Sequence, residues 1–581
     1  MERSNADTHV PPDVEIARNT SRRPIEDVAG ELGLEDDDLD HRGDGVAKLT
    51  WDAINRELDT PADGNLVLVT AMTPTRRGAG KTVTTVGLGQ ALAQQGESSV
   101  VAIREPSQGP VFGIKGGAAG GGYSQVLPME EINLHFTGDI HAVAAAHNLI
   151  AAMVDAERTH GNDLEIEPDS VAWNRTLDVN DRALREVVVG LGGRVNGPPR
   201  EDTFLITAAS ELMAVLCLAT DIADLKARIG RIVVAYNADG DPITVADLEC
   251  VGAVTALLKD ALRPNLVQTI EGTPAFVHGG PFANIATGTN SVLATHLGVR
   301  FGDYLVTEAG FGADLGAEKF VNIVSREGVT PDVAVVVATI DALTKHGEAM
   351  LERQQHSQYD GDIDGDTHSP ADDQVAAVRT GCANLDHHVD NLRAMGIPVV
   401  VAVNRFPDDT DEEVKAVLHH CQLREIPAAV STVHSDGGDG GLELATHVRE
   451  AAASDTASLE PSYELSMSID EKIRAVATQV YGADDVEFTP QARADIESLT
   501  EIGLDDVPVC LSKTPESLSD DPDEAGVPFG WELTVRELYP SAGAGFVVAL
   551  TGDVLTMPGL PADPAATDIE VDDDGTVHGL F

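Results

Sequence analysis

The segment 66–71 most constrains the fold, because this apolar run enters a glycine-rich turn and then a helical stretch, 83–94. A strand, a glycine loop and a helix in this order begin a parallel α/β unit. Parallel strands are covered on both faces and read as continuous apolar runs. Further strands are expected at 100–103, 203–207, 231–236, 304–308, 333–340 and 398–404. The sequence therefore predicts an α/β protein with a mostly parallel sheet.

The turn after the first strand has the composition of a phosphate-binding loop, Thr73-Pro-Thr-Arg-Arg-Gly-Ala-Gly-Lys-Thr82. In such loops backbone N–H groups surround the phosphates, the lysine reaches their oxygens, and the hydroxyl can bind Mg²⁺. The first glycine of the usual pattern is replaced by Thr75. A chance glycine turn before a helix is the alternative. We expect ATP to bind Thr75, Arg76, Arg77, Gly78, Ala79, Gly80, Lys81 and Thr82.

The charge of the chain excludes several classes of partner. Its 39 Lys and Arg residues face 96 Asp and Glu residues, a formal charge of −57, and only ten of the cations are lysines. Nucleic acids and anionic membranes need clustered cations, so we expect neither as a partner. Such a charge is tolerable in concentrated salt, which indicates a saline cytoplasm. An acidic disordered protein is the alternative, but 42% hydrophobic residues suffice for a large core.

Cysteine usage and hydropathy indicate a cytoplasmic location. Five scattered cysteines form no C-x-x-C pair and are expected as buried thiols in a reducing compartment. The chain starts without an apolar signal segment, and its longest apolar runs fall well short of the ~18 residues of a membrane span.

The length predicts several domains: a large phosphate-loop nucleotide-binding domain with a mostly parallel sheet plus two smaller domains. The expected divisions are 1–355 with an acidic N-terminal preface, an acidic surface insertion at 356–373, a smaller α/β domain at 374–458, and a C-terminal domain at 459–581. Alternating aspartates at 360–366 resemble a calcium loop, but Ala371 stands where an EF-hand needs glutamate.

Three other segments carry chemistry. A glycine-rich block, 104–123, offers Arg104 and Lys115 to anions, with a mobile low-complexity loop as the alternative. Small and polar residues at 273–284 and 307–319 follow apolar stretches, so they are expected at the carboxyl ends of strands, where α/β sheets bind ligands. His135, His141 and His147 recur every six residues, which does not place them on one helical face, so no metal is expected there.

These motifs together resemble the formate–tetrahydrofolate ligase family over nearly the whole chain. The strings that carry the resemblance include G-I-K-G-G-A-A-G-G-G-Y, F-V-H-G-G-P-F-A-N-I-A, T-E-A-G-F-G-A-D-L-G-A-E-K-F, S-L-S-D-D-P and T-M-P-G-L-P, in the family's order. The resemblance implies ATP-dependent ligation of formate to tetrahydrofolate, with or without a polyglutamate tail, through formyl phosphate. It also implies a homotetramer.

The resemblance also implies roles for particular residues. Lys81 and Arg104 would hold the formyl phosphate, Thr82 would meet Mg²⁺, and Glu105 and Asp139 would lie near a monovalent cation, K⁺ or NH₄⁺. The folate platform would comprise Phe406, Pro407 and, where the family has tryptophan, His434. A histidine can stack with less area than tryptophan, but His434 could also simply fill surface space.

Further departures from the family are Arg76, Arg77 and Ala79 in the loop and Thr287 where the family commonly has histidine. Two other functions stay open from the residues alone. One is a phosphate-loop ATPase or kinase acting on another carboxylate, which would need no folate. The other is a nucleotide-gated switch that binds a macromolecular partner and hydrolyses ATP slowly, indifferent to formate.

Overall fold

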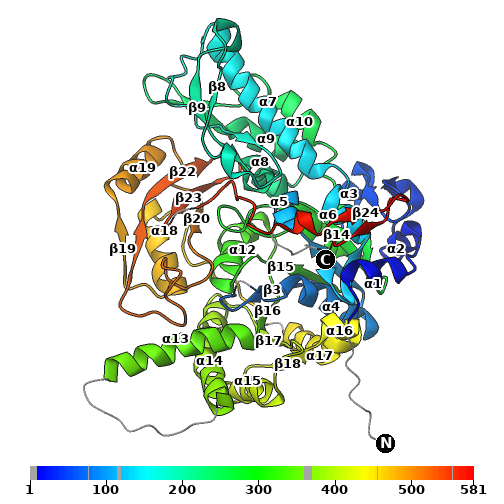
Figure 1. The fold of residues 1–581 in the computed structure, drawn as a ribbon. Coiled ribbons are helices and arrows are strands. Elements are labelled where there is room, and N and C mark those ends of the chain that lie inside the picture. Colours follow the sequence, from blue (N-terminus) through cyan, green and yellow to red (C-terminus); the bar gives the residue numbers. More distant parts are fainter. Residues whose placement is uncertain are drawn as a thin grey trace, which may run out of the picture.

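The computed structural model describes residues 10–75, 77–113, 119–358, 370–454, 456–552 and 554–580. A central sheet is flanked by a helical lobe, by C-terminal strands and helices, and by a layer of long helices (Figure 1). No helix within the described ranges is long and apolar enough to cross a membrane. The acidic aspartate-rich segment that resembles a calcium loop lies outside the described residues.

The central sheet has the order β1-β2-β13-β14-β4-β15-β3-β16-β17-β18, with β6 beside β13 and β5 beside β6. Neighbours from β14 to β18 are parallel, and the edge with β1, β2 and β13 is antiparallel. The predicted α/β class is confirmed. The strands are β1 Leu39–His41, β2 Ala47–Leu49, β3 Asn65–Ala71, β4 Ser99–Ile103, β5 Gly120–Gly121, β6 Ser124–Leu127, β13 Asn265–Thr269, β14 Pro274–Val277, β15 Tyr304–Glu308, β16 Val333–Ala338, β17 Val399–Asn404 and β18 Ala428–Ser431.

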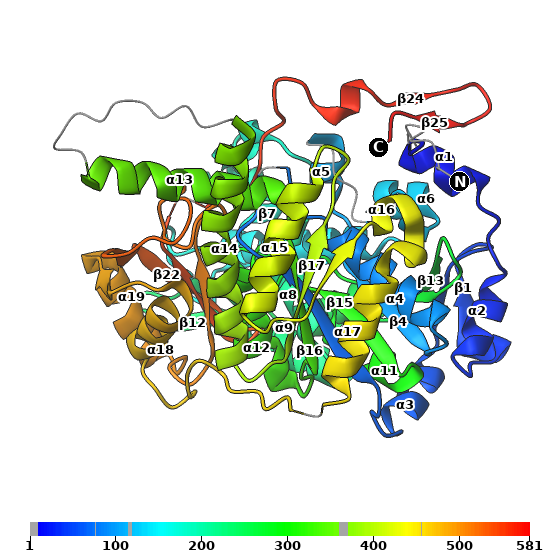
Figure 2. The same ribbon diagram turned by 90° about the horizontal axis from the view of Figure 1, so that it is seen from below.

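Helices cover both faces of the parallel strands, which explains their continuous apolar sequences. Along β3, Val67 and Val69 pack in one cluster with helices α4 and α17, and Leu66 and Leu68 pack in another with α11, α13, α14 and α15. Figure 2 shows α15 and α17 on either side of β17. These helices are α4 Lys81–Gln94, α11 Val292–Phe301, α13 Ile340–Gln358, α14 Pro370–Ala394, α15 Asp411–Leu423 and α17 Leu442–Ala452.

The segment expected as a smaller α/β domain, 374–458, contributes β17 and β18 to this same sheet. The predicted domain boundaries therefore separate stretches of chain that share one sheet, and they stay a prediction. The strand expected at 203–207 is shorter in the structure. Only Phe204–Leu205, β10, is paired as a strand there, because the chain turns into a 3₁₀ helix at Thr207–Ala209.

The helical lobe lies between β6 and β13 in sequence. Its elements are α7 Asp139–His160, β7 Arg175–Thr176, β8 Val187–Val189, β9 Arg200–Asp202, β10, α8 Glu211–Leu218, α9 Ile222–Arg231, β11 Val233–Tyr236, β12 Pro242–Thr244 and α10 Val251–Leu258. Helices α1 Asp13–Asn19, α2 Ile25–Glu31 and α3 Trp51–Leu58 form the N-terminal preface, and α5 Gln108–Gly113 and α6 Met129–Leu134 follow β4.

The C-terminal part packs beside the helical lobe (Figure 1). It comprises α18 Ile469–Val476, β19 Asp485–Phe488, α19 Pro490–Glu501, β20 Val509–Ser512, β21 Glu532–Val535, β22 Glu537–Ser541, β23 Phe546–Leu550, β24 Glu570–Val571 and β25 Val577–His578. The tail returns to the helical lobe, where Arg185 Nε donates to the Met557 carbonyl at 2.9 Å. All five cysteines are buried and unpaired, as expected.

Candidate active site

The predicted site residues gather at one edge of the sheet, because parallel strands end there together. Strand β3 leads into the predicted phosphate loop, β4 into Arg104 and Glu105, and β15 ends at Glu308. Strand β17 leads into Phe406, and β18 into the short helix α16, Val433–Asp436, with His434. In open α/β sheets the carboxyl ends of the strands are where ligands bind.

The predicted phosphate loop turns through two glycines into a helix. Gly78 and Gly80 have φ angles of +82° and +75°, and helix α4 begins directly afterwards at Lys81. A Cβ on Gly80 would lie 2.4 Å from Asn404 Nδ2, and the positive φ at this position favours glycine. The same Nδ2 donates to the Ala79 carbonyl at 3.1 Å. Asn404, at the end of β17, therefore holds the loop in place.

The start of the loop is held by a buried hydrogen-bond network around Thr73. Its N–H donates to Asn384 Oδ1 at 3.2 Å, and its carbonyl accepts from His346 Nε2 at 2.9 Å. Its hydroxyl lies 2.9 Å from His388 Nε2. The Gly526 N–H in turn donates to His346 Nδ1 at 2.8 Å. Helices α13 and α14 and the C-terminal part thus fix this end of the loop, which no local sequence signal indicates.

One carboxylate, Glu308, joins the predicted catalytic residues. The Thr82 hydroxyl donates to Glu308 Oε2 at 2.7 Å, and Arg104 Nη2 donates to Glu308 Oε1 at 3.3 Å. The pKa of Lys81 is lowered to about 8: burial lowers it most, the charge of Glu308 opposes that change, and the charge of Arg104 adds to it. The sequence alone assigns no role to Glu308, although it lies in the string T-E-A-G-F-G-A-D-L-G-A-E-K-F. The signal that could have indicated it is an acidic residue at the end of the buried strand β15, which pairs with β3, the strand that leads into the loop.

A cavity of about 600 Å³ opens beside the loop. It is large enough for a nucleotide-sized ligand. The Thr75 hydroxyl at its wall donates to Asp341 Oδ2 at 2.6 Å. Residues from the loop, from α13 and from the C-terminal part line it together: Thr75, Arg77, Asp341, Lys345, Glu516, Pro522, Asp523 and Ala525. Arg76 of the loop and Lys115 of the second glycine block lie outside the described residues.

The two carboxylates expected near a monovalent cation lie in one buried cluster. Burial and the neighbouring charge of Asp139 raise the pKa of Glu105, and Lys48 opposes that rise. Asp139 Oδ2 already accepts from Lys48 Nζ and Asn265 Nδ2, both at 2.8 Å. Glu105 Oε2 is buried without a partner among the described residues. An unpaired carboxylate oxygen fits a cation ligand, whereas Asp139 is largely satisfied by Lys48.

The expected folate platform lies next to the loop. Phe406 is half-buried, Pro407 and His434 are exposed, and the Arg405 N–H donates to the Ser431 carbonyl at 3.0 Å, which joins the two strand ends. The Arg77 guanidinium carbon lies 5.0 Å from the centre of the Phe406 ring, a cation–π contact. One of the loop's departures from the family therefore contacts the expected pterin-stacking residue.

Other residues from the motifs are buried supports. Lys513 Nζ pairs with Asp314 Oδ2 at 2.7 Å and donates to the Ser517 carbonyl, and both paired side chains are buried. Lys319 Nζ donates to the Ala283 carbonyl at 3.0 Å. Thr287, at the family's histidine position, is buried and its hydroxyl has no partner among the described residues.

A parallel sheet with a glycine loop, a lysine, an arginine and two acids at its carboxyl edge defines a nucleotide-using α/β enzyme. The family model described as formate–tetrahydrofolate ligase matches residues 11–581. A formate–tetrahydrofolate ligase of Haloquadratum walsbyi is 58% identical over 580 residues, 99% of this chain and 98% of the relative. Another, of Haloarcula marismortui, is 58% identical over 565 residues, 96% of this chain and all of the relative. The chain belongs to the formate–tetrahydrofolate ligase family.

Proposed function

We propose that the chain ligates formate to tetrahydrofolate at the expense of ATP, through formyl phosphate, at the sheet edge described above. Family membership over nearly the whole chain carries the ligase activity and the use of ATP. Neither a kinase for another carboxylate nor a nucleotide-gated switch is favoured by that match. The convergence of the predicted loop, Arg104 and Phe406 supports the placement of the reaction.

In the first half-reaction a formate oxygen attacks the γ-phosphorus of ATP, a new O–P bond forms, and ADP leaves with the electrons of the broken bond. Formate and ATP are both anions, so the main task of the protein is to neutralise charge and to position the reactants. We assign that role to Lys81, Arg104 and the backbone N–H groups of the loop. Asn404 and the network around Thr73 keep the loop in position.

In the second half-reaction the N10 amine of tetrahydrofolate attacks the formyl carbon, the C–O bond to phosphate breaks, and the amine loses its proton. The pterin must therefore lie close to the phosphate loop. The contact between Arg77 and Phe406 supports this, because it joins the loop to the expected stacking residue. We assign Phe406, Pro407 and His434 to the folate platform.

Incubation with ATP, formate and tetrahydrofolate in concentrated KCl tests this function. We expect 10-formyltetrahydrofolate, measured by the absorbance of its acid-converted methenyl form, with ADP formed in equal amount. Product should require all three substrates. ATP hydrolysis that is independent of formate and folate, from folded protein, would contradict the proposal.

We propose that Thr82 and Glu308 hold Mg²⁺ and that Glu105 holds a monovalent cation, K⁺ or NH₄⁺. Hydroxyl and carboxylate oxygens are the ligands that Mg²⁺ prefers, and the ion supplies charge neutralisation to the phosphates. The unpaired, buried Glu105 Oε2 is the observation that supports a cation there. Asp139 would attract the cation through its charge rather than bind it directly, because Asp139 is already paired with Lys48.

Substitution Glu308→Gln tests the assignment of Mg²⁺. The amide keeps the shape and can still accept from Thr82, but it loses the negative charge, so we expect the Mg²⁺ concentration for half-maximal activity to rise about tenfold or more. Mg²⁺-dependent ATP binding, measured by calorimetry, should weaken in parallel. Glu327→Gln, at the pair between Glu327 and Arg228, serves as the control. An unchanged Mg²⁺ requirement would show that Glu308 does not bind Mg²⁺.

Substitution His434→Trp tests the folate platform. Tryptophan has a larger ring face than histidine, so we expect the Michaelis constant for tetrahydrofolate to fall several-fold. The Michaelis constant for ATP should not change. An unchanged constant for tetrahydrofolate would show that position 434 does not stack on the pterin.

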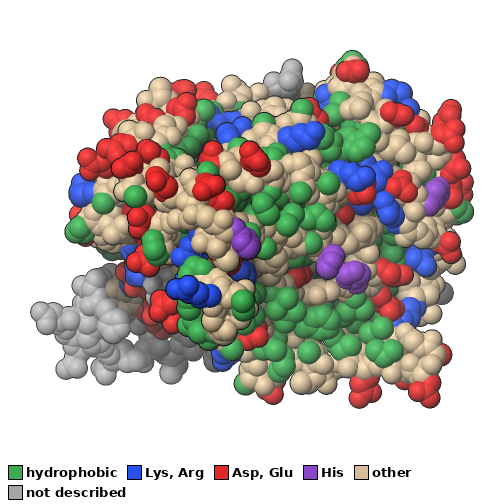
Figure 3. All heavy atoms as spheres, turned by 90° about the horizontal axis from the view of Figure 1, so that it is seen from above, with side chains coloured by type: hydrophobic (Ala, Val, Ile, Leu, Met, Phe, Trp, Pro, Cys, Tyr) green, Lys and Arg blue, Asp and Glu red, His purple; other side chains and the backbone are tan. Residues whose placement is uncertain are grey.

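We propose that the chain forms a homotetramer, works in the cytoplasm and accepts tetrahydrofolate with a polyglutamate tail. The face seen from above carries acidic side chains mainly towards its edges and hydrophobic ones near its middle (Figure 3). Near β8 and β9, Val188, Leu191 and Val195 are 53%, 65% and 90% exposed. Exposed apolar side chains on so acidic a chain support association between copies. Sedimentation in concentrated KCl measures the state.

A further inference from the structure

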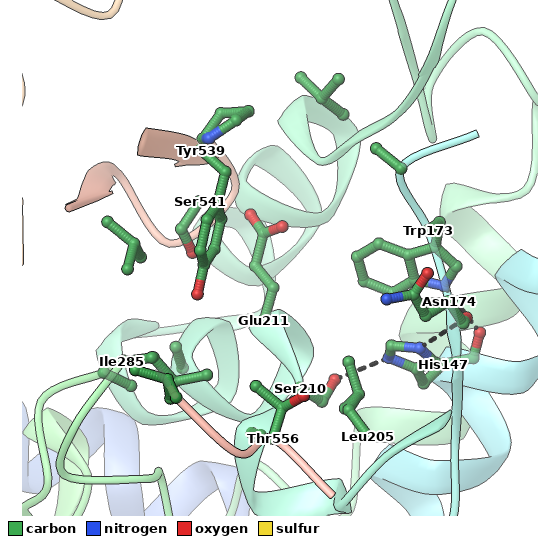
Figure 4. A pocket seen from close by; sticks show the side chains of 18 of the residues that line it. His147, Trp173, Asn174, Leu205, Ser210, Glu211, Ile285, Tyr539, Ser541 and Thr556 are labelled. Atoms are coloured by element: carbon green, nitrogen blue, oxygen red, sulfur yellow. Dashed lines mark hydrogen bonds between the residues drawn. The ribbon is translucent and has the colours of Figure 1, made fainter. Parts of the chain in front are cut away.

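A second cavity, of about 360 Å³, lies away from the phosphate loop, between helix α8 and strands β22 and β23 (Figure 4). Its size is that of a site for a small organic molecule. The main lining residues are His147, Trp173, Asn174, Leu205, Ser210, Glu211, Ile285, Tyr539, Ser541, Val548, Val554 and Thr556.

Glu211 is the one carboxylate among the described lining residues, and backbone N–H groups hold one of its oxygens. Its Oε1 accepts from the Gly543 N–H at 2.7 Å and more weakly from the Ala544 N–H at 3.4 Å. Its side chain points into the space between the Tyr539 and Trp173 rings (Figure 4). Burial raises the pKa of Glu211 to about 7, and the two backbone hydrogen bonds oppose that rise. No described side chain donates to this carboxylate, so it can accept from a ligand.

The wall opposite Tyr539 is rigid and aromatic. His147 and Trp173 are stacked with their ring centres 4.3 Å apart. His147 Nδ1 lies 2.8 Å from the Ser210 hydroxyl and Nε2 lies 3.0 Å from the Asn174 carbonyl, and burial lowers its pKa to about 3. The imidazole is therefore neutral and its hydrogen bonds are complete. This wall offers a flat apolar surface rather than a charge.

The lining determines which charge a ligand can carry. Among the described residues that line the cavity there is no lysine or arginine, and Glu211 is the one acid. An anion would lose its hydration without gaining a cationic partner, whereas an N–H donor would pair with Glu211. Formate, ATP and folate are anions, so this cavity is unsuited to the substrates of the proposed reaction.

We propose that this cavity is a second binding site, for a small aromatic molecule that is neutral or carries one positive charge and presents an amine- or amidine-type N–H edge to Glu211. The ring of such a molecule would lie between Tyr539 and the wall formed by His147 and Trp173. The proposal does not depend on the function assigned to the phosphate loop.

Three probes of one shape and different charge test the proposal: benzamidine, benzamide and benzoate, titrated by calorimetry into the full chain in concentrated KCl. We expect benzamidine to bind most tightly, benzamide more weakly, and benzoate not at all. Benzamidine binding should strengthen from about pH 6 to about pH 8 as Glu211 ionises. The titratable side chains that face Glu211 are Tyr539 and His147, and Arg228 lies behind the turn, donating to the Ala544 carbonyl.

Two variants locate the binding. Glu211→Gln keeps an acceptor for the Gly543 N–H and removes the charge, so benzamidine should lose roughly tenfold in affinity or more and benzamide little. Val554→Trp, at a half-buried lining residue, should block both probes by filling the cavity. Val571→Trp, an equal change at an exposed site, should leave binding intact. No benzamidine binding, equal binding of benzoate, or binding that survives Val554→Trp would overturn the proposal.

Discussion

Replacing Lys81 with methionine is expected to lower kcat/KM for ATP by about a thousandfold, because the ammonium neutralises charge that develops on the transferred phosphoryl group. Methionine keeps the unbranched stem and its packing at the start of α4. Steady-state kinetics of ADP formation, with formate and tetrahydrofolate saturating, measure the loss. Lys81→Arg should retain part of the rate, because it preserves the charge but not the geometry.

The pKa of Lys81 adds a second signature to this prediction. With a pKa lowered to about 8, the ammonium is protonated below that pH and loses its charge above it. The wild-type KM for ATP should therefore rise above about pH 8, and Lys81→Met should abolish this rise. Lys415→Met, at an exposed position on α15, is the matched control and should keep both rate and pH profile. A Lys81→Met enzyme with near-normal kcat/KM would exclude Lys81 from the phosphate site.

Replacing Lys513 with methionine is expected to destabilise the fold by about 3–5 kcal/mol, because it leaves Asp314 charged and unpaired in the interior. Both side chains of this pair are almost fully buried. Burial alone would raise the pKa of Asp314, but Lys513 holds it below its ordinary value. Urea unfolding followed by fluorescence measures the shift in midpoint. Salt screens a buried pair little, so the loss should persist in concentrated KCl.

A double variant shows whether the loss of stability comes from the unpaired charge of Asp314. Asp314→Leu combined with Lys513→Met removes both charges, so it should regain most of the lost stability. Arg424→Met breaks an exposed pair with Asp390 and should cost less than about 1 kcal/mol. If Lys513→Met unfolded at the wild-type urea concentration, the pair would not stabilise the fold. Loss of the Lys513 bond to the Ser517 carbonyl should also disturb the cavity beside the loop, which the neighbouring Glu516 lines.

The parallel strands could be predicted because burial on both faces leaves a continuous run of Val, Ile and Leu, as in Val333–Ala338. Short strands of ordinary composition have no such apolar run, so they cannot be predicted in this way. Strand β18, Ala428–Ser431, was not predicted, and it joins a sheet that the predicted domain boundary would have divided. A run of four residues carries too little periodicity to distinguish a strand from a loop.

The candidate site likewise has parts that could be predicted from the sequence and parts that could not. The predicted loop from Thr73 to Thr82 and the family's motifs are local patterns of a few residues at fixed spacing, so they can be recognised from the sequence alone. Glu308 became a site residue only through its bonds to Thr82 and Arg104. The two ends of the Thr73–Asn384 hydrogen bond are 311 residues apart. No local pattern records such a contact.

The sequence by itself determined the class of fold, the family and the residues at the ends of the strands, since all of these follow from local pattern and order. The tertiary structure alone decided which charges meet. It pairs Lys48 with Asp139, leaves Glu105 Oε2 without a partner among the described residues, and places Arg77 over Phe406. The physical reason is that the interaction between two charges, and the burial of each, depend on distances in space. The order of residues along the chain does not give these distances; they are set only when the sheet has formed.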